Sequence, residues 1–313
     1  MRTQRLGHRG PEISVVGFGG WEAGGGIWGK GPSSDQVIQA IRTAGDSGMT
    51  WCDTAEVYGH GRSEEFIGRA LEDRDDVMVF TKLAPGPGGS GFDRDGVRRG
   101  IEGSMRRLGR DVIDLYQLHW PDHSTPVEET WEAMAGLVEE GLVRWIGVSN
   151  FDRTLIERCE PIHHVDSLQP HFSLLHRSGK EELFSFCATN GTGIICYGPL
   201  AYGLLSGAIT ASTKFEADDW RRGDIGAGYY REFFAPGKFE RNLAIVERLS
   251  AVAERLAITV AQLALAWVFH QEGVTGAIAG SRSPEHVAEN AGAGDVELTA
   301  DDLREIDSIV ESG

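Results

Sequence analysis

Positive charge and long hydrophobic runs are both scarce in this chain of 313 residues. Asp and Glu number 47 against 30 Lys and Arg, which gives a formal net charge of -17. Nucleic acids and anionic membranes attract proteins through clustered Lys and Arg, so neither is expected as a partner. No stretch approaches the roughly 20 consecutive apolar residues that a membrane-spanning helix needs.

Cysteine is also scarce, and its spacing excludes the usual disulfide and zinc patterns. The four cysteines, Cys52, Cys159, Cys187 and Cys196, form no C-x-x-C pair, and we expect reduced, mostly buried thiols. The first 14 residues, "MRTQRLGHRGPEIS", lack the apolar core of a signal peptide. These two observations together predict a cytoplasmic location.

Short apolar runs rich in Val and Ile alternate with longer amphipathic stretches along the whole chain. The runs predict strands at 13–19, 49–53, 77–82, 112–119, 143–149, 166–169, 193–197 and 274–280. The stretches predict helices at 34–48, 63–71, 95–108, 127–141, 152–159, 180–189, 239–257, 259–271, 283–290 and 298–310. Ser and Asp at the start of the first helix, and Gly141 at the end of the fourth, are typical of helix caps.

Eight strands followed by helices at near-regular spacing favour a (β/α)8 TIM barrel, with a doubly wound sheet as the alternative. No break in composition marks a second domain, so residues 1–313 are expected to form one domain. The segment "PEIS" predicts the return arm of an N-terminal β-hairpin that covers the barrel floor. An extra C-terminal helix, capped by Thr299, closes the chain. The irregular stretch 206–238 is long enough to predict a functional loop.

Polar residues follow most of the apolar runs, at the points where the strands end. In a parallel barrel these ends meet on one face, where active sites lie. Tyr58 follows the second run by five residues, in the loop that Asp53 opens. The other residues at or just after strand ends are Lys82, His119, Ser149, Asn150, Gln169, Tyr197, Gly280, Ser281 and Arg282. The convergence of this many polar residues on one face predicts an active site there.

The first four of these residues, Asp53, Tyr58, Lys82 and His119, are suited to proton transfer to a carbonyl oxygen. A Tyr hydroxyl has a pKa of about 10, which a nearby ammonium lowers by favouring the phenolate. Asp53 could hold Lys82 in place, and Lys82 could then lower the pKa of Tyr58. The set contains no nucleophile with an adjacent base and no metal cage. It therefore favours hydride transfer, with the hydride supplied by a cofactor.

Six motifs resemble the aldo-keto reductase superfamily in order and spacing across essentially the whole chain. They are "DTAEVYGHGRSEE" (53–65), "TKL" (81–83), "DLYQLHWPD" (114–122), "IGVSNF" (146–151), "YGPLAYGLLSG" (197–207) and "GSRSPEHVAEN" (280–290). The resemblance implies NADPH-dependent reduction of aldehydes and ketones, with NADH as a possible second cofactor. It also implies a catalytic tetrad of Asp53, Tyr58, Lys82 and His119.

The same resemblance implies a set of cofactor contacts. Ser149, Asn150 and Gln169 would hold the nicotinamide amide, and Tyr197 would stack on the ring. The residues implied under the pyrophosphate are Leu200, Gly203 and Leu205. Those implied around the adenosine and its 2′-phosphate are Ser281, Arg282, His286, Glu289 and Asn290, and Gly280 is a further expected cofactor contact.

Three tryptophans placed after strands are expected to line the substrate pocket. They are Trp21, Trp28 and Trp120. His119 and His123 have the spacing of helical metal ligands, but Pro121 lies between them and no third ligand is evident. No metal is therefore expected.

Two patterns leave alternatives open. "GPGGSG" (86–91) fits a dinucleotide-binding glycine motif, but its prolines and the missing acidic strand end favour a loop at the pocket mouth. For the activity, the alternatives are a sugar or polyol dehydrogenase that runs in oxidation, and a cofactor-binding regulatory subunit. The expected partner is a small-molecule carbonyl substrate, and the sequence leaves the oligomeric state open.

Overall fold

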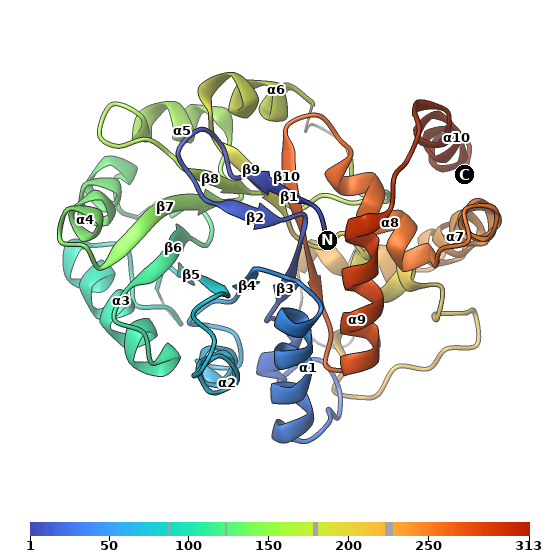
Figure 1. Cartoon of the computed structure of the whole chain (residues 1–313), viewed down its shortest axis with the longest axis horizontal. Helices are drawn as coiled ribbons and strands as arrows, with labels where there is room; N and C mark the ends of the chain where they lie inside the picture. Colours follow the sequence, from blue (N-terminus) through green and yellow to red (C-terminus); the bar gives the residue numbers. More distant parts are fainter. Residues whose placement is uncertain (87, 123, 178–180, 223–227) are drawn as a thin grey trace.

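Parallel strands form a closed barrel at the centre of the protein (Figure 1). The computed structural model describes residues 1–86, 88–122, 124–177, 181–222 and 228–313. The barrel order is β10-β3-β4-β5-β6-β7-β8-β9. The bounds are β3 Val16–Gly19, β4 Trp51–Asp53, β5 Met78–Leu83, β6 Ile113–Leu118, β7 Val143–Ser149, β8 Ser167–Gln169, β9 Gly193–Cys196 and β10 Val274–Gly280. The predicted TIM barrel is confirmed, and the doubly wound alternative is excluded because the sheet closes on itself.

Helices surround the barrel in the predicted order (Figure 1). They are α1 Ser34–Asp46, α2 Arg62–Ala70, α3 Arg94–Leu108, α4 Val127–Glu139, α5 Arg153–Cys159, α6 Glu181–Asn190, α7 Lys238–Arg255, α8 Val260–Phe269, α9 Pro284–Gly292 and α10 Ala300–Glu311. The side chains of Ser33, Thr259 and Thr299 each accept a hydrogen bond from a first-turn backbone N–H, which fixes where α1, α8 and α10 begin. The first residue of the predicted helix 180–189 lies outside the described residues.

The predicted N-terminal hairpin consists of β1 Thr3–Arg5 and β2 Glu12–Ser14, and it covers the end of the barrel at which the strands begin. The indole Nε1 of Trp51 donates to the carbonyl of Ser14 over 2.8 Å, which ties the hairpin to β4. The predicted strand 13–19 is therefore two strands, because the chain leaves the hairpin at Ser14 before it enters the barrel at Val16. A plug of buried side chains fills the barrel behind the hairpin: Leu6, Ile13, Trp51, Phe80, Leu115, Ile195 and Ile278.

The long stretch between β9 and α7 contains three short 3-10 helices: η2 Ala201–Ser206, η3 Trp220–Arg222 and η4 Gly228–Phe234. Residues 223–227 of the predicted loop 206–238 lie outside the described residues. The segment 216–222, here called the strap, meets the loop after β3. Trp220 N–H donates to the Ile27 carbonyl over 2.9 Å, and Lys30 N–H donates to Glu216 Oε2 over 2.6 Å. These two hydrogen bonds thus connect the strap to the loop after β3, above the strand ends.

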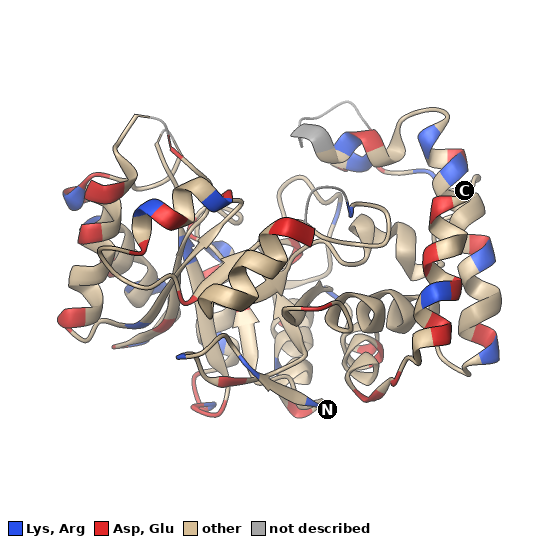
Figure 2. Ribbon diagram, turned by 90° about the horizontal axis from the view of Figure 1, so that it is seen from above, with Lys and Arg blue, Asp and Glu red and all other residues tan. Residues whose placement is uncertain are grey.

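Charged residues lie mainly on the outer helices and loops (Figure 2). Within the described part of the chain, no disulfide joins the four cysteines, and all four are buried, as their surroundings in the sequence predicted. Among the described residues, no single helix is long and apolar enough to cross a membrane; α7 and α8 pass that test only as a pair, and they are bent by 89°.

Candidate active site

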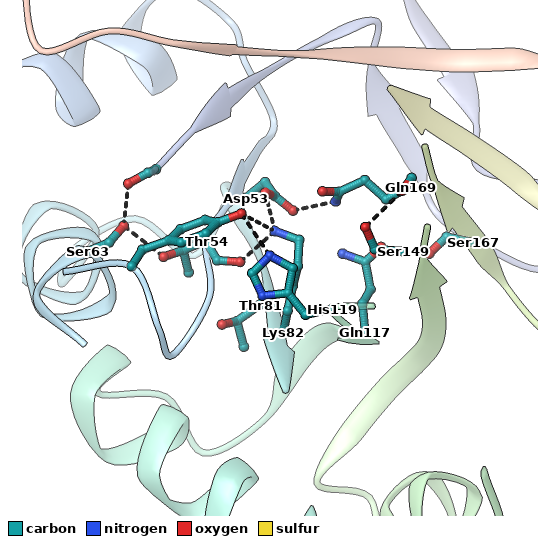
Figure 3. Close-up of polar contacts among 12 residues, drawn as sticks. Asp53, Thr54, Ser63, Thr81, Lys82, Gln117, His119, Ser149, Ser167 and Gln169 are labelled. Atoms are coloured by element: carbon teal, nitrogen blue, oxygen red, sulfur yellow. Dashed lines mark hydrogen bonds and ion pairs between the residues drawn. The ribbon is translucent and has the colours of Figure 1, made fainter. Parts of the chain in front are cut away.

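Lys82 lies at the end of β5 with its ammonium surrounded by three oxygen atoms (Figure 3). Nζ is 2.5 Å from Asp53 Oδ1, 2.8 Å from the Thr54 carbonyl and 3.4 Å from the Tyr58 hydroxyl. An ammonium has three N–H donors, so this arrangement gives each donor an acceptor. The three oxygens favour the charged form of Lys82, although burial lowers its pKa. Burial likewise raises the pKa of Asp53 against the effect of the ion pair.

Tyr58 reaches Lys82 because the chain turns sharply after β4. Gly59 and Gly61 have positive φ angles of 60° and 90°, which place the phenol back over the strand ends. The hydroxyl lies 3.3 Å from Nε2 of His119. Burial is the main cause that raises the pKa of Tyr58 well above its usual value, followed by the charges of Asp53 and Tyr230. The expectation of a lowered Tyr58 pKa is therefore wrong for the protein alone, because burial raises it.

His119 follows β6 and is neutral near physiological pH. Burial, and then the charge of Lys82, hold its pKa well below the usual value. Its Nδ1 is buried and has no hydrogen-bond partner within the described part of the chain. A neutral imidazole carries a proton on one ring nitrogen only. The nitrogen beside Tyr58, Nε2, can therefore either donate to or accept from a group bound there.

A polar network extends from this cluster along β7, β8 and β9. Gln169 Nε2 donates to Asp53 Oδ2 over 2.8 Å, and Ser149 Oγ donates to the Gln169 carbonyl over 2.9 Å (Figure 3). Asn150 Nδ2 donates to Ser149 Oγ over 3.1 Å, and the Tyr197 hydroxyl donates to Asn150 Oδ1 over 2.9 Å. The structure thus joins the four residues expected around a nicotinamide into one network that includes Asp53.

A cavity of about 380 Å³ runs from Asp53 and Tyr58 to Asn290 on α9. The other expected site residues that line it are Trp21, Trp28, Gln169, Tyr197, Leu200, Gly203, Gly280, Ser281, His286 and Glu289. Five glycines line it, and their missing side chains leave room for a ligand close to the backbone. α9 contributes His286, Glu289 and Asn290, so this helix borders one end of the cavity.

Other expected residues lie away from the cavity wall. Arg282 points toward the loop after β3, where Nη2 donates to the Trp28 carbonyl over 2.9 Å. It shares a separate hollow of about 190 Å³ with Arg62. Leu205 is fully buried in the main core. The Trp120 side chain is 39% exposed, with its ring centroid 4.2 Å from that of His119.

Residues that the sequence did not point to also line the cavity. Glu22, Tyr202 and Arg221 are all on its wall. Tyr230, in η4, places its hydroxyl 3.0 Å from that of Tyr197. Tyr202, Arg221 and Tyr230 come from the long stretch after β9. This stretch has no periodicity from which the direction of a side chain could be predicted. Glu22 did carry a signal, since it is the one carboxylate in the run "GFGGWEAGGGIWG".

The described residues contain no group of three His, Cys, Asp or Glu side chains placed to hold a metal ion, and His123 lies outside them. The cavity instead fits a long, anionic organic cofactor. Five glycines line it, α9 borders one end, and the Lys82 cluster lies at the other. This fold and site are those of an oxidoreductase barrel with a buried Lys–Asp pair and a phenol at one end of the cavity.

The chain belongs to the Aldo/keto reductase family, whose model matches residues 15–311. It is 34% identical to the aldo-keto reductase YhdN of Bacillus subtilis, an alignment that covers 100% of this chain and 94% of that protein. The family consists of NADP(H)-dependent oxidoreductases, so the protein is an enzyme.

Solved structures agree with this family. The glycerol dehydrogenase AKR11B4 of Gluconobacter oxydans superimposes with a TM-score of 0.87 and 31% identity, over 99% of this chain and 95% of that one. An aldo/keto reductase of Klebsiella pneumoniae in complex with NADP and acetate gives a TM-score of 0.74 and 30% identity, over 98% and 96% of the two chains.

Proposed function

We propose that this enzyme reduces aldehydes and ketones to alcohols with NADPH, and that Tyr58 is its general acid. The observation that carries the proposal is the 3.4 Å contact between the Lys82 ammonium and the Tyr58 hydroxyl. Because Lys82 donates to the phenolic oxygen, the hydroxyl proton of Tyr58 is free to point toward His119 or toward a bound carbonyl. Residues 1–313 are proposed to form one domain, which the extent of the family match supports.

Bound NADPH would supply the hydride for the carbonyl carbon. As the carbon–oxygen π bond breaks, Tyr58 gives its proton to the oxygen, and the product is an alcohol. The phenolate left on Tyr58 lies against the Lys82 ammonium, which Asp53 holds through the 2.5 Å ion pair. The neutral imidazole of His119, 3.3 Å from the phenol, orients the carbonyl oxygen. Tyr58 then regains a proton from solvent before the next turnover.

The cofactor contacts that we propose follow the cavity. Ser149, Asn150, Gln169 and Tyr197 hold the nicotinamide end, since their network meets Asp53. The proposed contacts further along are Leu200, Gly203, Leu205, Gly280, Ser281, Arg282, His286, Glu289 and Asn290. Trp21, Trp28 and Trp120 are proposed to contact the substrate. Among these, Arg282 must leave the Trp28 carbonyl if it is to reach a phosphate.

A panel of aldehydes and ketones, assayed with NADPH and with NADH by absorbance at the nicotinamide band, tests the reductase proposal. We expect turnover of several carbonyls with NADPH. A panel on which NADPH binds but no carbonyl is reduced would contradict the proposal. The cytoplasmic location expected from the sequence stays a prediction.

Oxidation of polyols is the second candidate, and one comparison favours it. The Gluconobacter oxydans structure, with its TM-score of 0.87, is a glycerol dehydrogenase. In this direction the same residues act in reverse, and Tyr58 is the base that accepts the alcohol proton. The test is the ratio of kcat/KM for glycerol and related polyols with NADP+ to that for the corresponding carbonyls with NADPH.

A further inference from the structure

Glu22 is a carboxylate on the wall of the cofactor cavity that the proposed mechanism does not use. It opens the short helix η1 (Glu22–Gly24) after β3 and lines the same cavity as Tyr58 and Asn290. In the part of the chain that the structure describes, no hydrogen bond or ion pair is made by its side chain. An unpaired carboxylate on the wall of a site for an anionic ligand calls for a physical explanation.

The two nearest cations are both engaged elsewhere. Arg221 Nη2 lies 2.6 Å from Asp219 Oδ2, and its Nε donates to Asp219 Oδ1 over 3.0 Å. Arg282 donates to the Trp28 carbonyl instead. Both arginines still favour the Glu22 carboxylate through space, but burial outweighs them and raises the pKa of Glu22 to about 7. In the protein without a ligand, the carboxyl therefore titrates in the neutral pH range rather than near its usual pKa.

We propose that Glu22 takes up a proton when the anionic cofactor fills this cavity, so that cofactor affinity is coupled to pH through this one carboxyl. The inference rests on the proposed function, which puts NADPH in this cavity. Phosphate charges placed in the same low-dielectric space disfavour a second anion. The complex therefore forms with Glu22 protonated, whereas the free protein holds it as a mixture of both forms.

The surroundings of Glu22 contain titratable and charged groups from each element packed against η1. The strap contributes Arg221 and Asp219, and the loop after β10 contributes Arg282. The groups from α2, from the loop after β4 and from α9 are Arg62, Tyr58, His286 and Glu289. Phosphate binding can draw the arginines toward the ligand, which weakens their effect on Glu22 and raises its pKa further.

The sign of the pH dependence follows from this linkage. Below pH of about 7 Glu22 is already protonated, so binding takes up few protons and the affinity is highest. Above pH of about 7 the proton must come from solvent, and Kd rises by up to about tenfold per pH unit until the pKa in the complex is reached. The uptake through Glu22 amounts to about half a proton at pH 7 and approaches one at about pH 8.

The test is isothermal titration of the full-length protein with NADPH in buffers of different ionisation enthalpy, which counts the protons taken up. Tryptophan fluorescence quenching gives Kd over the same pH range. The Glu22→Gln variant keeps the shape of the side chain and removes its titration. Glu272→Gln, which makes the same charge change at an exposed position before β10, is the matched control. Protons exchanged by the 2′-phosphate contribute equally in all three proteins.

We expect wild type and Glu272→Gln to take up about 0.5 to 1 more proton than Glu22→Gln between about pH 7 and 8. We also expect Glu22→Gln to lose most of the rise in Kd with pH. Equal proton counts and parallel Kd profiles in all three proteins would overturn the role of Glu22 and leave the proposed function intact. Absence of NADPH binding to the wild type would overturn both. Glu22→Ala, with the same readouts, replaces Glu22→Gln if the latter does not fold.

Discussion

The ammonium of Lys82 donates to the hydroxyl of Tyr58 over 3.4 Å, and this contact sets the direction in which the phenolic proton can point. Two further acceptors, Asp53 and the Thr54 carbonyl, occupy the other N–H groups. The ammonium is thus held in place and cannot turn away from the phenol without losing a hydrogen bond. Lys82 therefore keeps its protons in the proposed reaction, and the proton that is transferred comes from Tyr58.

Tyr58→Phe removes the hydroxyl and keeps the ring. We expect NADPH affinity to stay within a few-fold of wild type and carbonyl reduction to fall by about 10²–10⁴, the usual contribution of a positioned general acid. Fluorescence titration and steady-state assays of the same preparation measure the two quantities. Near-wild-type reduction by this variant would show that the proton comes from another group.

Lys82→Met removes the ammonium that stabilises the phenolate. Burial already raises the pKa of Tyr58. Loss of the ammonium should raise it further, because the ammonium favours the phenolate. Alcohol oxidation requires the phenolate, so its kcat/KM should rise with pH until the pKa of Tyr58 is reached. The variant should therefore need a higher pH than wild type for the same fraction of its maximal rate, and its rate at neutral pH should fall by at least about 10²-fold. Superimposable pH profiles for the two proteins would argue against this role of Lys82.

Arg282→Ala tests the origin of cofactor preference. A guanidinium can pair bidentately with a phosphate, and such charge-assisted hydrogen bonds are worth about 1–3 kcal/mol. We expect the variant to bind NADPH more weakly and to bind NADH with little change, so the difference in binding free energy should narrow by that amount. Arg282→Lys is a useful comparison, since it keeps the charge and loses the planar fork. Equal affinity of the wild type for both cofactors would defeat the prediction.

Trp220→Ala tests whether the strap retains the cofactor. Trp220 is fully buried and its ring centroid lies 5.6 Å from that of Trp28, while its backbone N–H donates to the Ile27 carbonyl. Removing the indole should loosen the strap (216–222) from the loop after β3 and raise the rate of NADPH release by about tenfold or more. Stopped-flow displacement of NADPH measures this rate. An unchanged release rate, with unchanged thermal stability, would show that the strap does not limit exit.

The barrel could be predicted from the sequence because periodicity and strand ends are local signals. The run "WCD" ends at Asp53 and "TKL" contains Lys82, so parallel strands alone bring these two together. The pKa of Tyr58 could not be predicted in this way. The direction of its shift depends on how much water the folded protein excludes and on the charges of residues such as Tyr230, 172 positions away in the chain.

Local sequence patterns also could not predict the direction of side chains in irregular segments. Arg282 lies at the expected place in the chain, but its guanidinium turns to the Trp28 carbonyl rather than into the cavity. Strand alternation says nothing about a residue two positions beyond the end of the strand. The same limit applies to Glu22, whose environment is made by the strap some 200 residues further on.

The hairpin of β1 and β2 seals the end of the barrel at which the strands begin, and the side chains around Trp51 and Phe80 fill the space above it. The side chains of this plug are all buried in the described part of the chain, so molecules are expected to enter and leave the reaction chamber from the strand-end side. The ligand that binds deeper in the cavity has to bind first and dissociate last. The closed end of the barrel thereby fixes the order in which the ligands bind and dissociate. The enzyme is therefore expected to follow ordered kinetics, although the hairpin lies at the opposite end of the barrel from the ligands.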